Sequence, residues 1–131
     1  MAEQDREERA MLEILERDSR YARGAYDFVR SAVHYASHVV FERGTHVTGR
    51  ELLEGIRQLA IERYGVMIQD VFAEWGVIST EDFGEIVFNL VDAGLLSKTA
   101  QDSKDDFKNV YSFAEVFDAA ECLENTLDTA L

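Results

Sequence analysis

Residues 78–98, ISTEDFGEIVFNLVDAGLLSK, hold the pattern that decides the fold. Apolar side chains recur there at the i, i+3, i+4, i+7 and i+8 spacing of an amphipathic helix: Phe83, Ile86, Val87, Leu90 and Val91. Ser79 can cap the start of this helix and Gly94 can end it. The spacing therefore predicts a helix over 80–93, followed by a short strand at Leu95–Thr99.

Three stretches of the chain share one signal for a helix start. An apolar residue is followed by Ser or Thr, then by any two residues, an acid and a second apolar residue. The hydroxyl can accept the backbone N–H three positions on, the acid can accept the N–H of the cap, and the apolar pair packs across the turn. The signal begins at Val47, Ile78 and Tyr111. It predicts helix starts near 48, 79 and 112.

The remaining apolar periodicity predicts further helices and a second strand. The predicted helices span about 4–17, 25–43, 49–64, 66–75, 80–93 and 113–130. Asn109–Phe113 is the second strand, joined to Leu95–Thr99 through a polar loop. Helix, short extended piece, helix, helix and hairpin is the order of a winged-helix unit. We expect one domain over 1–131, mostly α with a small β-hairpin. Its winged-helix-like core covers about 25–113, between the N-terminal helix 4–17 and the C-terminal helix 113–130.

Composition excludes several classes of protein. With 47% hydrophobic and 30% charged residues in 131, the chain can bury a core and is not typical of a disordered protein. No apolar run reaches the roughly 18 residues of a membrane span, and the charged N-terminus lacks the apolar core of a signal peptide. One cysteine, Cys122, fits a reducing compartment. We therefore expect a cytoplasmic protein without a membrane partner.

The net charge of −13 is unevenly distributed. Residues 1–65 hold 10 arginines against 12 acids, a balance of −2, and residues 66–131 hold 3 lysines against 14 acids, a balance of −11. The second half would attract cationic partners and repel phosphate backbones. A merely solubilising surface would carry the same charge.

The predicted helix 80–93 turns acids, not bases, toward solvent. Its outer face carries Glu81, Glu85 and Asp92, and among its polar residues only Asn89 is a natural reader of base edges. The loop that would form the wing combines Lys104 and Lys108 with Asp102, Asp105 and Asp106. Such a face would release few counterions from a duplex. DNA binding by a winged-helix regulator is therefore an alternative, and we do not expect nucleic acid as the partner.

Two groups of residues could carry chemistry. His34 and His38 have the i, i+4 spacing that can hold one metal ion, with His46 as a conceivable third ligand. No H-E-x-x-H motif supports them, so surface histidines are the preferred interpretation and a metal protein or enzyme is the second alternative. Cys122 lies between Glu121 and Glu124, whose charge suppresses a thiolate. We predict no enzyme, no cofactor and no metal.

Four stretches support a resemblance to a known family. They are RYARGAYDFV (20–29), HVTGRELLEGIRQLA (46–60), STEDFGEIVFNLVDAGLLSKT (79–99) and DSKDDFKNVY (102–111). Over about residues 12–118 the chain resembles an uncharacterised family of small acidic bacterial proteins, the Minf-type hypothetical proteins. The resemblance implies a bacterial, cytosolic protein and assigns no activity or site residue.

The sequence thus predicts a non-enzymatic protein-interaction or regulatory module. Phe88 lies at the edge of the buried stripe, where it either packs under the C-terminal helix or forms an exposed anchor for another protein. The surrounding acids would suit a basic partner. The predicted partner surface comprises Glu81, Glu85, Phe88, Asn89, Asp92, Asp102, Asp105 and Asp106. The C-terminal helix carries a short apolar seam that would also allow a homodimer.

Overall fold

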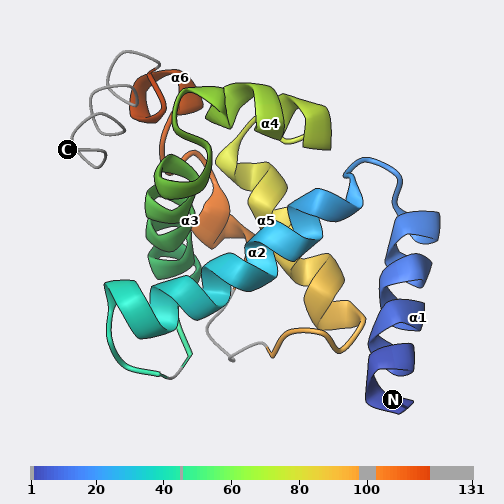
Figure 1. The fold of residues 1–131 in the computed structure, drawn as a ribbon. Coiled ribbons are helices and arrows are strands. Elements are labelled where there is room, and N and C mark those ends of the chain that lie inside the picture. Colours follow the sequence, from blue (N-terminus) through green and yellow to red (C-terminus); the bar gives the residue numbers. More distant parts are fainter. Residues whose placement is uncertain (1, 45, 98–102, 119–131) are drawn as a thin grey trace.

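The protein is seen in a computed structural model that describes residues 2–44, 46–97 and 103–118. These residues form helices and connecting turns, with no strand among them. The elements are α1 (Ala2–Arg17), α2 (Arg23–Tyr35), the π-helical turn η1 (Ala36–Val40), α3 (Gly49–Tyr64), η2 (Gly65–Met67), α4 (Ile68–Trp75), α5 (Thr80–Asp92), η3 (Lys104–Phe107) and α6 (Phe113–Val116). In Figure 1, α2 and α5 run through the middle of the molecule, between α1 on one side and α3 on the other.

All three predicted helix starts are confirmed. Thr48 and Glu51 form the full capping box of α3: the Glu51 N–H donates to Thr48 Oγ1 at 3.1 Å, and the Thr48 N–H donates to Glu51 Oε1 at 2.9 Å. At α5 the Ser79 N–H donates to Asp82 Oδ2 at 3.2 Å. α6 begins after Ser112, whose side chain makes no capping bond. The local signal is therefore formed at α3 and α5, whereas α6 begins at the predicted position without a side-chain cap.

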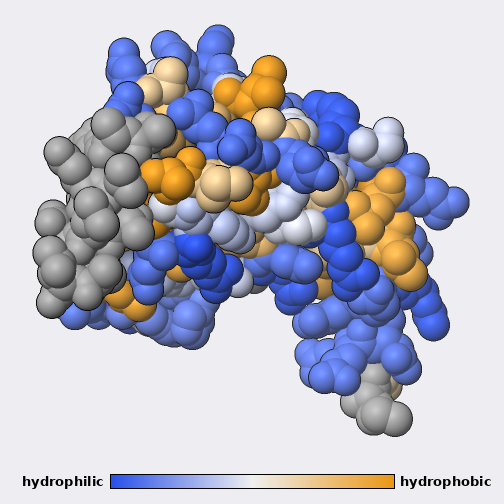
Figure 2. Space-filling view, turned by 45° about the horizontal axis from the view of Figure 1, so that its top comes forward, coloured by the Kyte–Doolittle hydropathy of each residue, from blue (hydrophilic) through white to orange (hydrophobic). Residues whose placement is uncertain are grey.

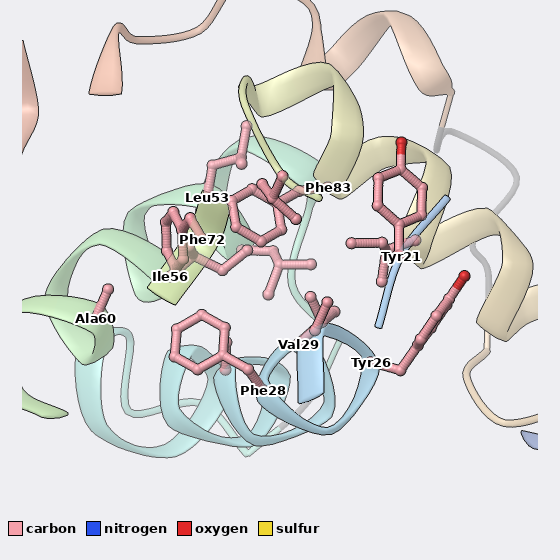
Figure 3. Packing of buried hydrophobic residues seen from close by; sticks show 14 of the residues in the cluster. Tyr21, Tyr26, Phe28, Val29, Leu53, Ile56, Ala60, Phe72 and Phe83 are labelled. Carbon is pink, nitrogen blue, oxygen red and sulfur yellow. The ribbon is translucent and has the colours of Figure 1, made fainter. Parts of the chain in front are cut away.

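The apolar faces of the helices meet around one buried ring, Phe72 of α4. Its centroid lies 5.9 Å from that of Phe28 on α2 and 5.3 Å from that of Phe83 on α5. The rings of Phe113 and Phe117, near the end of the described chain, lie 5.4 and 5.6 Å away. Figure 3 shows side chains of α2, α3 and α5 converging on this ring. The described helices thus share one core.

The predicted β-hairpin is wrong. Leu95 and Leu96, in the first strand, fold back over the end of α5, where their N–H groups donate to the Leu90 carbonyl at 2.8 and 3.3 Å. In the second strand the Val110 N–H donates to Thr80 Oγ1 at 3.2 Å, and Phe113 begins a helix. Within the described ranges no strand offers these N–H groups a ladder partner. Residues 98 and 99 of the first strand lie outside the described residues.

The loop expected between the strands contains a helical turn instead. Ser103 and Asp106 form a third capping box, at the start of η3. This turn directs Phe107 into the core, where its side chain is 2% exposed. The apolar residues around 95 and 110 therefore pack as turns on α5, and the fold is all-α over the described residues.

The second helix ends earlier than predicted and in a different geometry. α2 stops at Tyr35 and continues as the π turn η1 to Val40, where the prediction has one helix to 43. The Phe41 N–H donates to the Ala36 carbonyl at 3.0 Å, the i→i+5 bond of a π-helix. Ala36 packs against Gly55 of α3 so closely that a Cβ added at Gly55 would lie 2.6 Å from the Ala36 Cβ. Close packing on α3 thus accompanies the change in helix type.

The C-terminal helix predicted over 113–130 is described only at its start. α6 ends at Val116, and Phe117 leaves the helical conformation with φ −111° and ψ 38°. The rest of the predicted helix, from 119, lies outside the described residues, as does the homodimer seam on it. The N-terminal helix, predicted over 4–17, spans Ala2–Arg17.

A tight corner joins α4 to α5 and holds the connection between α1 and α2. Gly76 ends α4 in the left-handed region at φ +85°, and a Cβ there would lie 2.3 Å from the Arg20 carbonyl oxygen. The Ala22 N–H donates to the Trp75 carbonyl at 3.1 Å. The α1–α2 connection therefore lies directly against this corner, and glycine is needed at Gly76 for both space and conformation.

The surface seen in Figure 2 is hydrophilic over most of its area, with separate hydrophobic patches. Among the described residues the exposed large apolar side chains are Leu12, Val39, Val66, Met67 and Ile78. No helix in the described ranges combines the length and apolarity that a membrane span needs.

Candidate functional site

The acids predicted to face a partner on α5 differ in the bonds that they make. Asp92 is exposed, and Glu81 is exposed while accepting the Asn109 N–H, which lowers its pKa, and the Thr80 hydroxyl at 3.3 Å. Glu85 is half-buried and accepts bonds from Lys104 at 3.0 Å and from Arg20 at 3.4 Å. The bond from Lys104, more than that from Arg20, lowers the pKa of Glu85. Glu85 therefore links α5 to two other segments of the chain.

Asn89, the expected reader of base edges, is used inside the molecule. Its side-chain amide donates to Asp18 Oδ2 at 3.0 Å and to the Tyr26 hydroxyl at 3.1 Å. Asp18 also accepts two bonds from the Arg20 guanidinium, at 3.0 and 2.7 Å. The bonds from Arg20, with a smaller contribution from Asn89, hold the pKa of Asp18 well below its ordinary value. Asn89 thus fastens the α1–α2 connection to α5.

The acids of the former hairpin loop are divided in the same way. Asp105 is exposed, whereas Asp106 is half-buried and accepts the Ser103 N–H at 3.0 Å as part of the capping box of η3. Asp102 lies outside the described residues. Lys104 bonds to Glu85, and its Nζ lies 6.0 Å from the centre of the Phe88 ring. The predicted partner surface is therefore not one continuous acidic face.

Phe88 lies in the wall of an open pocket of about 610 Å³, which we name the α2–α5 pocket. Its walls come from α2 and η1, from the start of α3, from α5 and from the turns that replace the hairpin. The lining residues are Arg30, Val33, His34, Ser37, His38, Gly44, His46, Val47, Thr48, Gly49, Leu52, Val87, Phe88, Val91, Leu95, Leu96, Ser97 and Phe107. Apolar side chains from distant parts of the sequence thus share one cavity.

The polar groups of the α2–α5 pocket are basic or neutral. All three histidines of the chain line it, together with Arg30, and no lining residue is an acid. His34 and His38 are exposed, as predicted, and their ring centroids lie 4.1 Å apart in an edge-on arrangement. His46 is exposed as well. In a chain of charge −13, this pocket is a local exception.

The π turn supplies part of this wall. Ser37 and His38 belong to η1, and both line the pocket. The carbonyl of Ser37 accepts the N–H groups of Arg43 and Gly44 at 2.9 and 3.1 Å, which turns the chain back toward His46. Single π turns inside helices are rare and are frequent at functional sites. The turn therefore brings the histidines of two chain segments to one opening.

The described part of the chain does not arrange these histidines as a metal site. No three side chains of His, Cys, Asp or Glu within it converge on a point where they could hold an ion. Cys122 lies outside the described residues. His46 shares the pocket with His34 and His38 without completing a ligand set.

Glu81 lies at a different place, beside a second cavity of about 520 Å³. This cavity is lined by α4, the α4–α5 corner and the turn from Asn109 to Ala114. Ile78 on its edge is 80% exposed. Glu81 and Phe88 therefore do not belong to one cavity, although both are on α5.

Most residues of the α2–α5 pocket escape prediction because they are far apart in the sequence. Phe107 was the one available signal: an aromatic residue inside the polar stretch 100–108, directly after a Ser-x-x-Asp cap. That pattern indicates a short capped turn with an anchored ring. Leu95 and Leu96 fit a strand equally well on sequence alone.

Comparison of the chain with family models, with curated proteins and with solved structures finds no match. The family resemblance over residues 12–118 therefore stays an expectation.

Proposed function

We propose that the protein is a non-enzymatic interaction or regulatory module that recognises another protein through the α2–α5 pocket. The supporting observation is the pocket itself: about 610 Å³, mostly apolar walls, and three exposed histidines among the lining residues. Binding sites are typically concave and apolar, with a few polar groups that orient the occupant. Phe88, the expected anchor, lines the wall of this pocket and does not project from the surface toward a partner.

The charge of the site changes the partner that we propose. The acids on α5 suggest a basic partner on sequence alone, but Glu85 pairs with Lys104 and Arg20 of the same chain. The pocket presents Arg30 and three histidines instead. An apolar side chain flanked by an acid would suit this site better than one flanked by a base.

We also propose that α3, α4 and α5 keep a winged-helix-like arrangement without a β wing. It is supported by the four-residue corner Gly76–Ser79, by the buried Val77 within it, and by the packing of α3 against both α4 and α5. The arrangement gives little support to DNA binding. The side-chain amide of Asn89 donates to Asp18 and Tyr26 instead of facing solvent, and the exposed Glu81 and Asp92 would repel a phosphate backbone.

Site-specific photo-crosslinking tests the protein-binding role. A photoreactive amino acid at Leu96, in the pocket, should capture one partner in cells, whereas the same group at the exposed Met67 of η2 should not. The captured protein, purified, should bind the wild type. Val91→Trp, which fills the pocket, should weaken that binding about tenfold or more.

Val66→Trp is the matched control, because Val66 is an exposed valine outside the α2–α5 pocket. It should leave the affinity within a factor of about two. Equal capture from Leu96 and Met67, or equal affinity of the two tryptophan variants for the captured protein, would refute the proposal.

A further inference from the structure

The α2–α5 pocket differs in charge from the rest of the molecule. The chain carries 26 acids against 13 lysines and arginines, yet every ionisable residue that lines the pocket is an arginine or a histidine. The first turn of α3, at Thr48 and Gly49, also lies in the wall. The start of a helix adds partial positive charge. The pocket opening therefore favours a negative group.

Two acids near the opening already make ion pairs, one of them with Arg30 of the pocket itself. Glu7 of α1 pairs with Arg30 at 3.4 Å, at an arginine side chain that is 34% exposed. Glu51 accepts the Thr48 N–H and pairs with Arg43, which does not line the pocket. Among the described residues, His34, His38 and His46 make no salt bridge. The imidazoles are thus available to an incoming anion.

The apolar part of the pocket lies against α5 and the turns beyond it. Val87, Phe88 and Val91 come from α5, and Leu96 and Phe107 from the segments on either side of the undescribed residues 98–102. The Phe107 side chain is buried, which makes this wall firm. The cavity therefore has a basic rim and an apolar interior, and a volume within the usual range of about 300–1,000 Å³ for small-molecule sites.

We propose that the α2–α5 pocket binds a small amphipathic anion, an unbranched apolar chain with one carboxylate head. The imidazole N–H groups of His34 and His38 and the guanidinium of Arg30 donate to the carboxylate oxygens. The chain lies against Phe88, Val91 and the neighbouring apolar side chains. This inference shares the pocket with the proposed function but not its protein partner. The small ligand would compete with that partner for the same wall, which is how a regulatory module could be controlled.

Calorimetric titration with three probes of equal chain length tests the charge preference without any mutation. Octanoate should bind about tenfold more tightly than octanol, because a charged acceptor gains the bonds of the rim. Octylammonium should bind more weakly than octanol. Octanoate should also bind up to about 15-fold more tightly than hexanoate, the gain from burying two more methylene groups.

Variants locate the head group. The double variant His34→Gln and His38→Gln, and separately Arg30→Gln, should remove most of the preference for octanoate over octanol while octanol still binds. Arg63→Gln is the matched control, since Arg63 is an exposed helical arginine outside the pocket. Circular dichroism checks that each variant is folded.

The outcomes separate the two proposals. Octanol binding as tightly as octanoate would overturn the anion preference and leave the pocket as an apolar binding site. No binding of any probe would overturn the small-ligand inference, while the crosslinking test of the protein partner would stand or fall separately. Octanoate binding that survives both Arg30→Gln and the double histidine variant would also overturn it, because the head would lie elsewhere.

Discussion

At the scale of single residues, two polar side chains on α5 form hydrogen bonds that hold other segments of the chain against this helix. Asn89 joins Asp18 and Tyr26, and Glu85 joins Arg20 and Lys104. Each bond connects segments separated by many positions in the chain. A polar residue on the outer face of an amphipathic helix is normally solvated, so the sequence alone predicts that Glu85 and Asn89 face solvent. Here the α1–α2 connection covers that face.

Asn89→Ala should therefore lower the free energy of unfolding by about 1–3 kcal/mol, because it leaves Asp18 and the Tyr26 hydroxyl without the amide donor. Asp92→Ala, at an exposed position one turn along the same helix, is the control and should stay within about 0.5 kcal/mol of the wild type. Urea denaturation at neutral pH measures both. Equal stability of the two variants would mean that the Asn89 bonds add nothing to water contacts.

At the scale of elements, glycine corners and caps organise the chain. Gly76 and Gly94 end α4 and α5, both with φ in the left-handed region, at +85° and +78°. Their surroundings differ. A Cβ at Gly76 would meet the Arg20 carbonyl oxygen at 2.3 Å, whereas a Cβ at Gly94 would have nothing within 4 Å. Comparing alanine variants at the two glycines therefore separates the loss of stability due to backbone strain from the loss due to steric contact with Arg20.

Gly94→Ala should cost about 1–2 kcal/mol, the strain of placing a Cβ in the left-handed region. Gly76→Ala should cost clearly more, because the α1–α2 connection must also move away from the corner. Chemical denaturation of the two variants against the wild type gives the comparison. If both lost the same stability, the contact between Gly76 and Arg20 would be looser than the structure shows.

At the scale of the whole molecule, the sequence predicts helices better than it predicts their contacts. The capping signals at Thr48 and Ser79 and the stop at Gly94 are local, and they are confirmed. The hairpin is wrong because a short apolar run after a glycine fits a strand and a packed turn equally well. What distinguishes them is a partner strand, and none exists among the described residues.

The candidate site shows the same division. The exposure of His34 and His38 follows from helix periodicity, and it is confirmed. Their shared pocket with Phe88 and Phe107 depends on how α2 crosses α5 and on where η3 docks. Those are long-range contacts, which no local pattern in one sequence encodes. Phe88 was therefore identified as unusual while its surroundings were not.

The shared core should make unfolding a single event. Trp75 packs against Phe28, Phe72 and Tyr64, with ring centroids 5.5, 5.8 and 5.8 Å away, so its fluorescence reports the junction of α2, α3 and α4. Fluorescence and far-ultraviolet circular dichroism should then give the same urea midpoint, as expected for one cooperative domain. A fluorescence midpoint well below that of the helical signal would show that the core opens before the helices do.

The π turn makes the wall of the α2–α5 pocket depend on chain length as well as on residue type. A π turn accommodates one more residue than an α-helical turn would, and each residue of an α-helix advances the direction of the side chains by about 100°. Loss of a single residue within Ala36–Val40 would change where the chain leaves the helix, and so the positions of Gly44 and His46 relative to His38. Proteins of similar composition but different length here would not be expected to share this opening.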